Sequence, residues 1–319
     1  MPVTVKEPAA AAGPGPGGRK TGPQRRRRRG GGLARLGPLP WIAPAVLLIV
    51  VVVLWPIYEL IRTSFLNVSI SGFVRGSAGT EKYRQLFDES GFGSVLTMTV
   101  VWTIAVVGVT MLLSLGLAQL FNKPFPGRTV TRWALIAPWA ASVLMTAIGF
   151  RWMLDQTAGV LNTLMTDIGL TDGPKDWLGD PATAWPWMMF VAVFVSLPFT
   201  TYTLLAGLQT IPHEVYEAAR IDGANSRQTY WRVTVPLLRP AFLVGFVINL
   251  INVFNSFPVI WAMTKGGPGS DTATTTVFMY QLKDTDIGES AAMSVVNFAM
   301  VVVLVLIFLK VSRWNKEDA

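Results

Sequence analysis

The chain has 319 residues, of which 51% are hydrophobic and only 14% are charged, with a formal net charge of +8. A water-soluble domain normally carries about a quarter charged residues, so this composition indicates a membrane protein. The sequence has no cysteine and a single histidine, His213, which excludes disulfides, thiolate nucleophiles and metal sites built from Cys or several His.

The first 38 residues differ from the rest of the chain. They are rich in Ala, Gly and Pro and contain a basic run from Arg25 to Arg29. Such a segment has little to bury, so we expect residues 1–38 to be a disordered tail. A basic run can bind nucleic acid, but this one directly precedes the first apolar stretch, where it is expected to hold the N-terminus in the cytoplasm and contact anionic lipid. No cleaved signal peptide is expected.

Residues 39–319 contain six apolar runs, each long enough to cross about 30 Å of hydrocarbon. They predict an all-α, polytopic membrane protein with six transmembrane helices. The spans are expected at about Trp41 to Ile61, Val95 to Phe121, Trp133 to Leu154, Trp185 to Leu208, Ala241 to Met263, and Ala291 to Val311. Prolines in or near the spans predict kinks, as neighbours can satisfy the freed carbonyls: Pro56, Pro138, Pro198 and Pro258.

The distribution of charge predicts an orientation. Most of the 27 Lys and Arg residues fall in the tail, in segments 122–132 and 209–240, and at the C-terminus. Because basic residues concentrate in cytoplasmic loops, both termini are predicted to be cytoplasmic. At the opposite ends of spans one and three, i, i+3 and i, i+4 spacing predicts two local ion pairs: Glu59 with Arg62, and Arg151 with Asp155.

The segment between spans four and five predicts two short helices joined by a turn. A first helix is expected to open at Pro212, with Glu214 and Glu217 in its first turns, where the helix dipole favours negative charge. Gly223 can take the positive φ that a turn requires. Asn225 or Ser226 can cap the second helix.

The second helix is expected to run to Val233, and Pro236 and Pro240 are expected to end it and open the fifth span.

This segment resembles the EAA loop of binding-protein-dependent ABC importer permeases. The family pattern is Glu-Ala-Ala, three residues, Gly, nine residues and Ile-x-Leu-Pro; here Glu217 begins the triplet, Gly223 follows, and Val233 begins the last element. The resemblance implies the MetI-like permease fold, with a coupling helix that docks on an ATPase subunit. The residues expected to couple are Glu214, Glu217, Ala218, Ala219, Arg220, Asp222, Gly223 and Ala224.

Two further segments are similar to the sugar-permease group, which includes maltose-type and glycerol-phosphate-type permeases. One begins at Trp177 in the second outer loop, and the other is the Gly-rich run after span five. The resemblance covers about residues 40–312. It implies that an external solute-binding protein docks on the outer loops, at Gly266, Gly267 and Pro268 among others.

Polar residues in span five form a candidate substrate path. Asn249, Asn252, Asn255 and Ser256 recur at helical spacing, so they are expected to share one face that points into the bundle. They either hydrogen-bond neighbouring helices or exchange hydrogen bonds with sugar hydroxyls.

The family match places Ser196 and Phe199 of span four opposite them, with core packing as the alternative for Phe199.

The sequence therefore predicts a permease subunit, not an enzyme, that carries a di- or oligosaccharide across the bacterial cytoplasmic membrane. It contains no P-loop motif, so ATP and Mg²⁺ are expected on a partner. The expected partners are a second homologous permease, an ATPase dimer and a solute-binding protein. Glycerol phosphate or its diesters are the alternative substrates. A secondary transporter or channel is disfavoured by the lack of charges near the bilayer centre, and a membrane enzyme by the lack of a catalytic cluster.

Overall fold

The computed structural model describes residues 39–314, so the predicted tail 1–38 and the last five residues lie outside the described residues. Contacts divide the chain into two units at Leu54 and Trp55. The first unit contains α1 (Leu39–Leu48) and the π-helix η2 (Ile49–Leu54).

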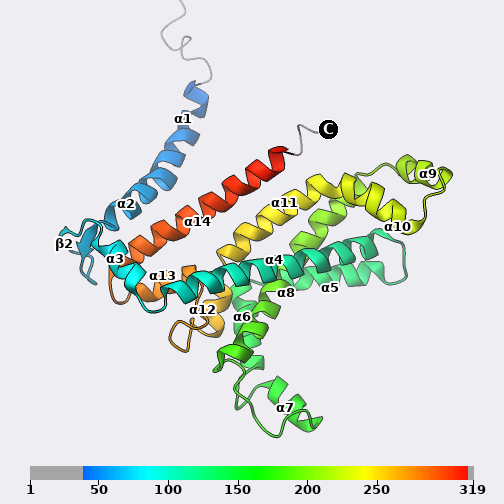
Figure 1. Cartoon of the computed structure of the whole chain (residues 1–319). Coiled ribbons are helices and arrows are strands. Elements are labelled where there is room, and N and C mark those ends of the chain that lie inside the picture. The colour runs from blue at the N-terminus through cyan, green and yellow to red at the C-terminus, as the bar shows by residue number, and fades with distance from the viewer. Residues whose placement is uncertain (1–38, 315–319) are drawn as a thin grey trace, which may run out of the picture. The chain divides into compact units, whose positions relative to one another are not determined.

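The second unit is almost wholly helical (Figure 1). Its helices and strands, in chain order, are α2 (Trp55–Thr63), β1 (Leu66–Val68), β2 (Val74–Ser77), α3 (Glu81–Asp88), α4 (Phe92–Asn122), α5 (Arg128–Ala140), α6 (Val143–Met153), α7 (Val160–Asp167), α8 (Pro181–Gln209), α9 (His213–Ile221), α10 (Ser226–Thr229), the π-helix η3 (Tyr230–Thr234), α11 (Val235–Phe254), α12 (Phe257–Met263), α13 (Thr275–Leu282) and α14 (Ile287–Trp314).

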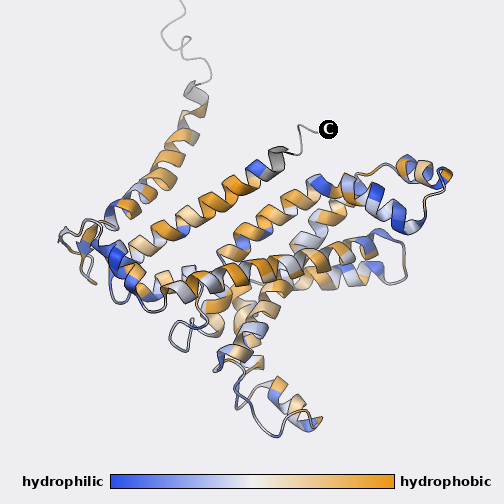
Figure 2. Cartoon of the chain, in the orientation of Figure 1, coloured by the Kyte–Doolittle hydropathy of each residue, from blue (hydrophilic) through white to orange (hydrophobic). Residues whose placement is uncertain are grey.

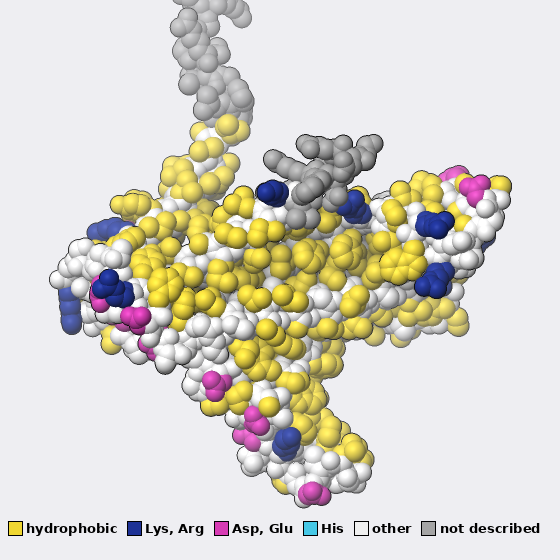
Figure 3. All heavy atoms as spheres, in the orientation of Figure 1, with side chains coloured by type: hydrophobic (Ala, Val, Ile, Leu, Met, Phe, Trp, Pro, Cys, Tyr) yellow, Lys and Arg dark blue, Asp and Glu magenta, His cyan; other side chains and the backbone are white. Residues whose placement is uncertain are grey.

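Five helical segments are long and apolar enough to span a membrane among the described residues. They are Ile42–Thr63, Phe92–Asn122, Pro181–Gln209, Ser226–Met263 and Ile287–Phe308. Hydrophobic residues dominate these segments (Figure 2). On the face shown in Figure 3, the charged side chains lie mainly toward the ends of the helices. They correspond to five of the six predicted spans.

The third predicted span, 133–154, is not one helix. It folds as α5 and α6, separated by Ala141 and Ser142, whose backbones are extended at ψ 149° and 138°. Pro138 lies three residues before the break and has no N–H to donate within α5. The sequence therefore pointed to a kink, whereas the helix breaks completely one turn later.

The fifth predicted span also differs from expectation at both ends. Pro236 does not end the preceding helix, because α10, η3 and α11 follow one another without a gap. The π-helical turn just before it, where the Val235 N–H bonds the carbonyl of Tyr230, widens the backbone next to a proline that cannot donate. At the other end, α11 stops at Phe254, and Asn255 and Ser256 separate it from α12.

A short antiparallel hairpin of β1 and β2 precedes α3, a feature that the sequence did not predict. Leu66 pairs with Ser77, and the register shifts between Asn67 and Val68. Beyond it, Lys82 of α3 is almost fully buried and donates to Asp286, at 2.6 Å, just before α14 begins. The predicted Glu59–Arg62 pair is confirmed at 2.9 Å.

The predicted Arg151–Asp155 pair is wrong. Asp155 instead accepts from the backbone N–H groups of Thr157 and Ala158, while Arg151 donates to the carbonyl of Ala262 at 3.1 Å. The Ala158 amide, with the Thr157 hydroxyl and amide, lowers the pKa of Asp155. The arginine thus ties α6 to the end of α12 and does not close a turn of its own helix.

The helices pack around two apolar cores. The larger joins α4, α6, α8, α12 and α13, and in it the buried Trp102 donates its indole N–H to the carbonyl of Val253, at 3.2 Å. The smaller lies at the other end of α4 and α8, around Phe121, Leu204 and Leu238. Both α8 and α11 contribute residues to each core. In each helix, polar residues lie in the sequence between the part that enters the larger core and the part that enters the smaller one: Ser196, Thr200 and Thr201 in α8, and Asn249 in α11.

Candidate functional site

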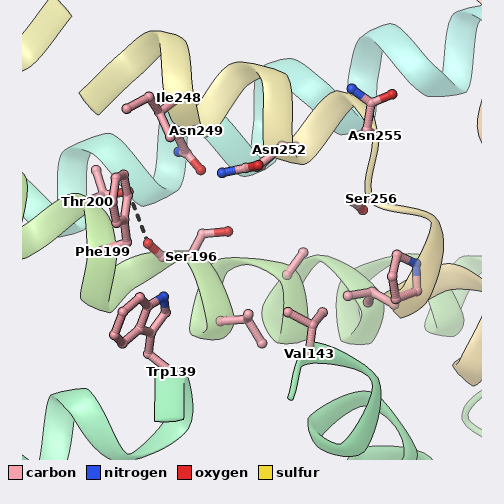
Figure 4. A pocket seen from close by; sticks show the side chains of 15 residues that line it. Trp139, Val143, Ser196, Phe199, Thr200, Ile248, Asn249, Asn252, Asn255 and Ser256 are labelled. Carbon is pink, nitrogen blue, oxygen red and sulfur yellow. Dashed lines mark hydrogen bonds between the residues drawn. The ribbon is translucent and has the colours of Figure 1, made fainter. Parts of the chain in front are cut away.

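A cavity of about 380 Å³ lies where both broken spans meet α8 (Figure 4). Its volume is within the usual range of small-molecule sites, about 300–1,000 Å³. None of the lining side chains is charged. They are Trp139, Val143, Ala192, Val195, Ser196, Phe199, Thr200, Ile248, Asn249, Asn252, Val253, Asn255, Ser256, Pro258 and Val259.

All six residues predicted to contact substrate line this one cavity. Asn249 and Asn252 extend from α11 toward the side of α8 that carries Ser196 (Figure 4). Asn249 is only 2% exposed, and its Nδ2 has no hydrogen-bond partner among the described residues. Oγ of Ser256 is also a buried atom without a hydrogen-bond partner among the described residues. Buried polar atoms without partners are costly, so the cavity offers hydrogen bonds that a polar ligand can take.

Asn255 does not lie on the predicted helical stripe. It follows the last residue of α11, and its side-chain amide donates to the carbonyl of Ile251, at 3.0 Å. The prediction of one continuous polar face, from Asn249 to Ser256, is wrong because the helix ends inside it. The break nevertheless brings Ser256 to the cavity wall.

Sequence reasoning missed Trp139, which is 58% exposed and lines the cavity, as Val143 does. Pro138 indicated a kink in this span. No sequence pattern indicated that the helix would break completely and place the Trp139 indole at the cavity. Together with Phe199, Trp139 gives the site aromatic surface in addition to its amide side. A larger groove of about 700 Å³, between α4, α11 and α14, is lined almost wholly by apolar side chains and offers few hydrogen bonds.

The predicted coupling segment forms the expected helix, turn and capped second helix. The turn after α9 is closed by two backbone hydrogen bonds, from Gly223 N–H to the carbonyl of Arg220 at 3.0 Å and from Ala224 N–H to that of Ala219 at 2.9 Å. This is a Schellman motif, and Gly223 has the left-handed φ of 76° that the motif requires. Asn225 and Gln228 then form a capping box on α10.

Most of the coupling segment is exposed. Glu214, Glu217, Ala218, Arg220, Asp222 and Gly223 face solvent, Ala224 is half-buried, and only Ala219 is buried. Glu217 also contacts His213, with 3.1 Å between Oε1 and Nδ1. Ile221, which sequence reasoning did not single out, is 86% exposed beside the turn. A large aliphatic side chain at the tip of a loop is a feature of contact surfaces.

The Gly-rich segment after α12 is a turn held by several hydrogen bonds. Thr272 Oγ1 lies 2.8 Å from Thr264 Oγ1 and from the carbonyl of Gly267, and Gln281 donates to the carbonyls of Lys265 and Gly269. Of the three residues predicted to dock a partner, Gly266 is buried, Gly267 is half-buried and Pro268 is exposed. Pro268 is therefore the one that a partner can reach directly.

The sequence matches the model of the binding-protein-dependent transport system inner membrane component over residues 33–315. A probable ABC transporter permease protein of Brucella suis is 38% identical over 87% of this chain and 96% of its own. A sulfoquinovosyl glycerol transport system permease of Agrobacterium fabrum is 31% identical over 85% and 89%. A trehalose/maltose transport system permease of Thermococcus litoralis is 30% identical over 75% and 81%.

Among solved structures, a bacterial ABC transporter that imports the acidic polysaccharide alginate matches with a TM-score of 0.74. It is 21% identical, and the match covers 88% of this chain and 96% of that one. At this identity the likeness shows the fold, and it agrees with the MetI-like permease architecture predicted from the EAA pattern. The chain belongs to the family of inner membrane components of binding-protein-dependent transport systems, as a permease subunit of an ABC importer.

Proposed function

We propose that this subunit forms, with a second homologous permease, the path of a neutral di- or oligosaccharide. The observation that carries the proposal is the cavity at the two helix breaks. Amide and hydroxyl groups line it from Asn249, Asn252 and Ser196, aromatic surface comes from Trp139 and Phe199, and no charge is present. Sugars match this combination, because their hydroxyls exchange hydrogen bonds and their ring faces pack on aromatic rings.

The lack of a cation at the cavity argues against glycerol phosphate and its diesters, the alternative substrates. A phosphate group would be stabilised by Arg or Lys, and neither lines the site. Among relatives, one is named for trehalose and maltose and another for sulfoquinovosyl glycerol, an anionic glycoside. Both names favour a sugar, and the uncharged lining favours the neutral kind.

The same proposal assigns α9 and its Schellman turn to the contact with an ATPase dimer, which would bind ATP and Mg²⁺. The surface around Glu217, Ile221 and Gly223 is exposed and therefore available to a partner. A solute-binding protein would deliver the sugar at the opposite ends of the helices, on loops that include Pro268. The chain would then lie in the bacterial cytoplasmic membrane with both termini in the cytoplasm. Closure of the ATPase dimer on ATP would move α9 and favour the outward-facing permease conformation over the inward-facing one.

The substrate proposal is tested by uptake into proteoliposomes that contain the whole complex and its binding protein. The panel is radiolabelled maltose, trehalose, sulfoquinovosyl glycerol and glycerol 3-phosphate. We expect ATP-dependent uptake of a neutral sugar, reduced at least tenfold by Asn252→Ala. Ser294→Ala is the matched control, because its hydroxyl bonds only within its own helix. Uptake of the anionic compounds alone would refute the neutral class, and unchanged uptake in Asn252→Ala would remove the cavity from the path.

The coupling proposal is tested with Glu217→Lys and Gly223→Asp, which should abolish uptake without preventing membrane insertion. Gly223→Asn separates charge from backbone strain, because Asn and Asp both tolerate the left-handed conformation. A Cβ at this position would meet no atom within 4 Å in this chain. If contact with the partner matters, Gly223→Asn should keep more ATPase binding than Gly223→Asp. If all three variants transport normally, the coupling assignment is wrong.

A further inference from the structure

The break in the third span exposes the N-terminus of α6 to the cavity. Trp139, in the last turn of α5, and Val143, the first residue of α6, both line it, so the break itself forms part of the wall (Figure 4).

The first N–H groups of a helix have no partner within the helix. Ser142 precedes α6 but its side chain makes no capping bond, and among the described residues no acceptor meets the N–H groups of Val143, Leu144 or Met145. The first amide with a partner is that of Thr146, which donates to the carbonyl of Ser142, at 2.9 Å.

Among the described helices, side chains cap the starts of α8 and α10, whereas several others, such as α4 and α13, begin without a side-chain cap. Asp180 accepts from Ala182 before α8, and Pro181 there has no N–H to satisfy. α12, which begins at the second break, has Pro258 near its start and so offers fewer donors. The start of α6 differs from these in its location, because its first residue lines the cavity within an apolar segment, where an unpaired backbone donor costs several kcal/mol.

A second observation points to a ligand at the same place. The buried side chain of Asn249 reaches the cavity from the opposite helix, and its Nδ2 lacks a partner. Donors therefore approach the cavity from two sides: backbone amides with the positive end of the α6 dipole, and an asparagine amide. This arrangement suits acceptor oxygens, such as the hydroxyl, ring and glycosidic oxygens of a sugar.

We propose that the N-terminus of α6 is a sugar-binding element in which backbone N–H groups of residues 143–145 donate to substrate oxygens while the sugar passes. The inference rests on the proposed function and extends it to a third span. It makes the interruption of span three a functional feature that sets which sugar oxygens can be held beside Trp139. Amides from the backbone give this recognition without any charge at the site.

Val143→Pro tests the proposal, because it deletes one N–H and keeps the helix. Proline is favoured at the first position of a helix, and Ser142 already has the extended backbone that precedes proline. The Val143 amide has no bond to lose. Val143→Ala is the matched control, since it trims the side chain and retains the N–H.

In the uptake assay with maltose and trehalose, we expect Val143→Pro to transport about five- to tenfold more slowly than Val143→Ala, as one hydrogen bond to substrate is lost. Melting temperatures of both variants should agree. In the wild-type complex, whichever of these sugars is transported should slow hydrogen exchange at residues 143–145.

Equal uptake by the two Val143 variants, or exchange that sugar does not alter, would overturn the inference. The proposed function would survive either result if Asn252→Ala still lost uptake. If the wild-type complex takes up only the anionic compounds of the panel, the neutral class and this inference both fail.

Discussion

Gly207 and Gly245 provide a sharp test of how α8 packs on α11. A Cβ placed on Gly207 would overlap the Cβ of Ala241 and lie 3.0 Å from Cδ1 of Leu238. Both neighbours lie on α11, and the Cβ of Ala241 cannot rotate away. A Cβ on Gly245 would meet only Thr203, at 3.5 Å, which is an ordinary contact.

The two substitutions to alanine should therefore have opposite effects. Overpacking in a well-packed interface costs about 1–3 kcal/mol, and replacing a helical glycine by alanine returns about 0.5–1 kcal/mol. Gly207→Ala should then destabilise by about 1–2 kcal/mol. Gly245→Ala should be neutral or slightly stabilising, because only the second effect applies.

Thermal unfolding of the purified complex in detergent, followed by tryptophan fluorescence, measures the difference. At about 2–4 °C for each kcal/mol, Gly207→Ala should melt several degrees below Gly245→Ala. Equal melting temperatures would mean that α8 and α11 are not in the close contact described. Gly207→Ala should also slow uptake if transport requires this contact to be kept.

Three further predictions concern other parts of the chain. Asp286→Asn should destabilise by about 3 kcal/mol, since it leaves Lys82 buried without a counter-charge. Burial raises the pKa of Asp286, but the hydrogen bonds from Lys82 and the Glu289 amide outweigh burial and hold this pKa below its ordinary value of 3.8. The wild type should therefore lose the stability that the ion pair contributes only as the pH falls below 3.8. A pH series of melting temperatures should show this loss in the wild type and not in Asp286→Asn. Asn162→Leu should make the segment 155–177 sensitive to limited proteolysis, because the buried amide bonds backbone groups of Asp155, Gln156 and Lys175 and the indole N–H of Trp177; unchanged cleavage would count against that role. Ile221→Asp should leave the free energy of unfolding within about 0.5 kcal/mol of the wild-type value, because the side chain is exposed, yet it should reduce co-purification of an ATPase. Full retention of the ATPase would exclude Ile221 from the contact.

The sequence predicted the features that depend on local pattern. Five apolar spans were identified by length and hydropathy, and the turn at Gly223 by its residue type, because only a glycine readily takes the left-handed φ observed there. The six candidate substrate residues line one cavity. In the sequence, only the polar residues of span five showed a helical spacing that pointed to a shared face.

Features that depend on tertiary context were missed. Hydropathy cannot distinguish a continuous helix from two helices in line, so the breaks at Ser142 and Ser256 could not be predicted, and Trp139 was overlooked with them. Arg151 has an acidic residue at the right spacing but bonds a carbonyl of α12 instead, because α6 packs against that helix. In each case, a distant segment determined the outcome.

The central claim is that sugar passes through the cavity at the two breaks. It is tested most directly by a density map of the assembled complex, with binding protein and a transported sugar, trapped before the sugar is released. We expect sugar density between Asn252 and Trp139, with an oxygen within hydrogen-bond distance of the start of α6. Sugar density along another surface of the subunit, with this cavity holding only water, would contradict it.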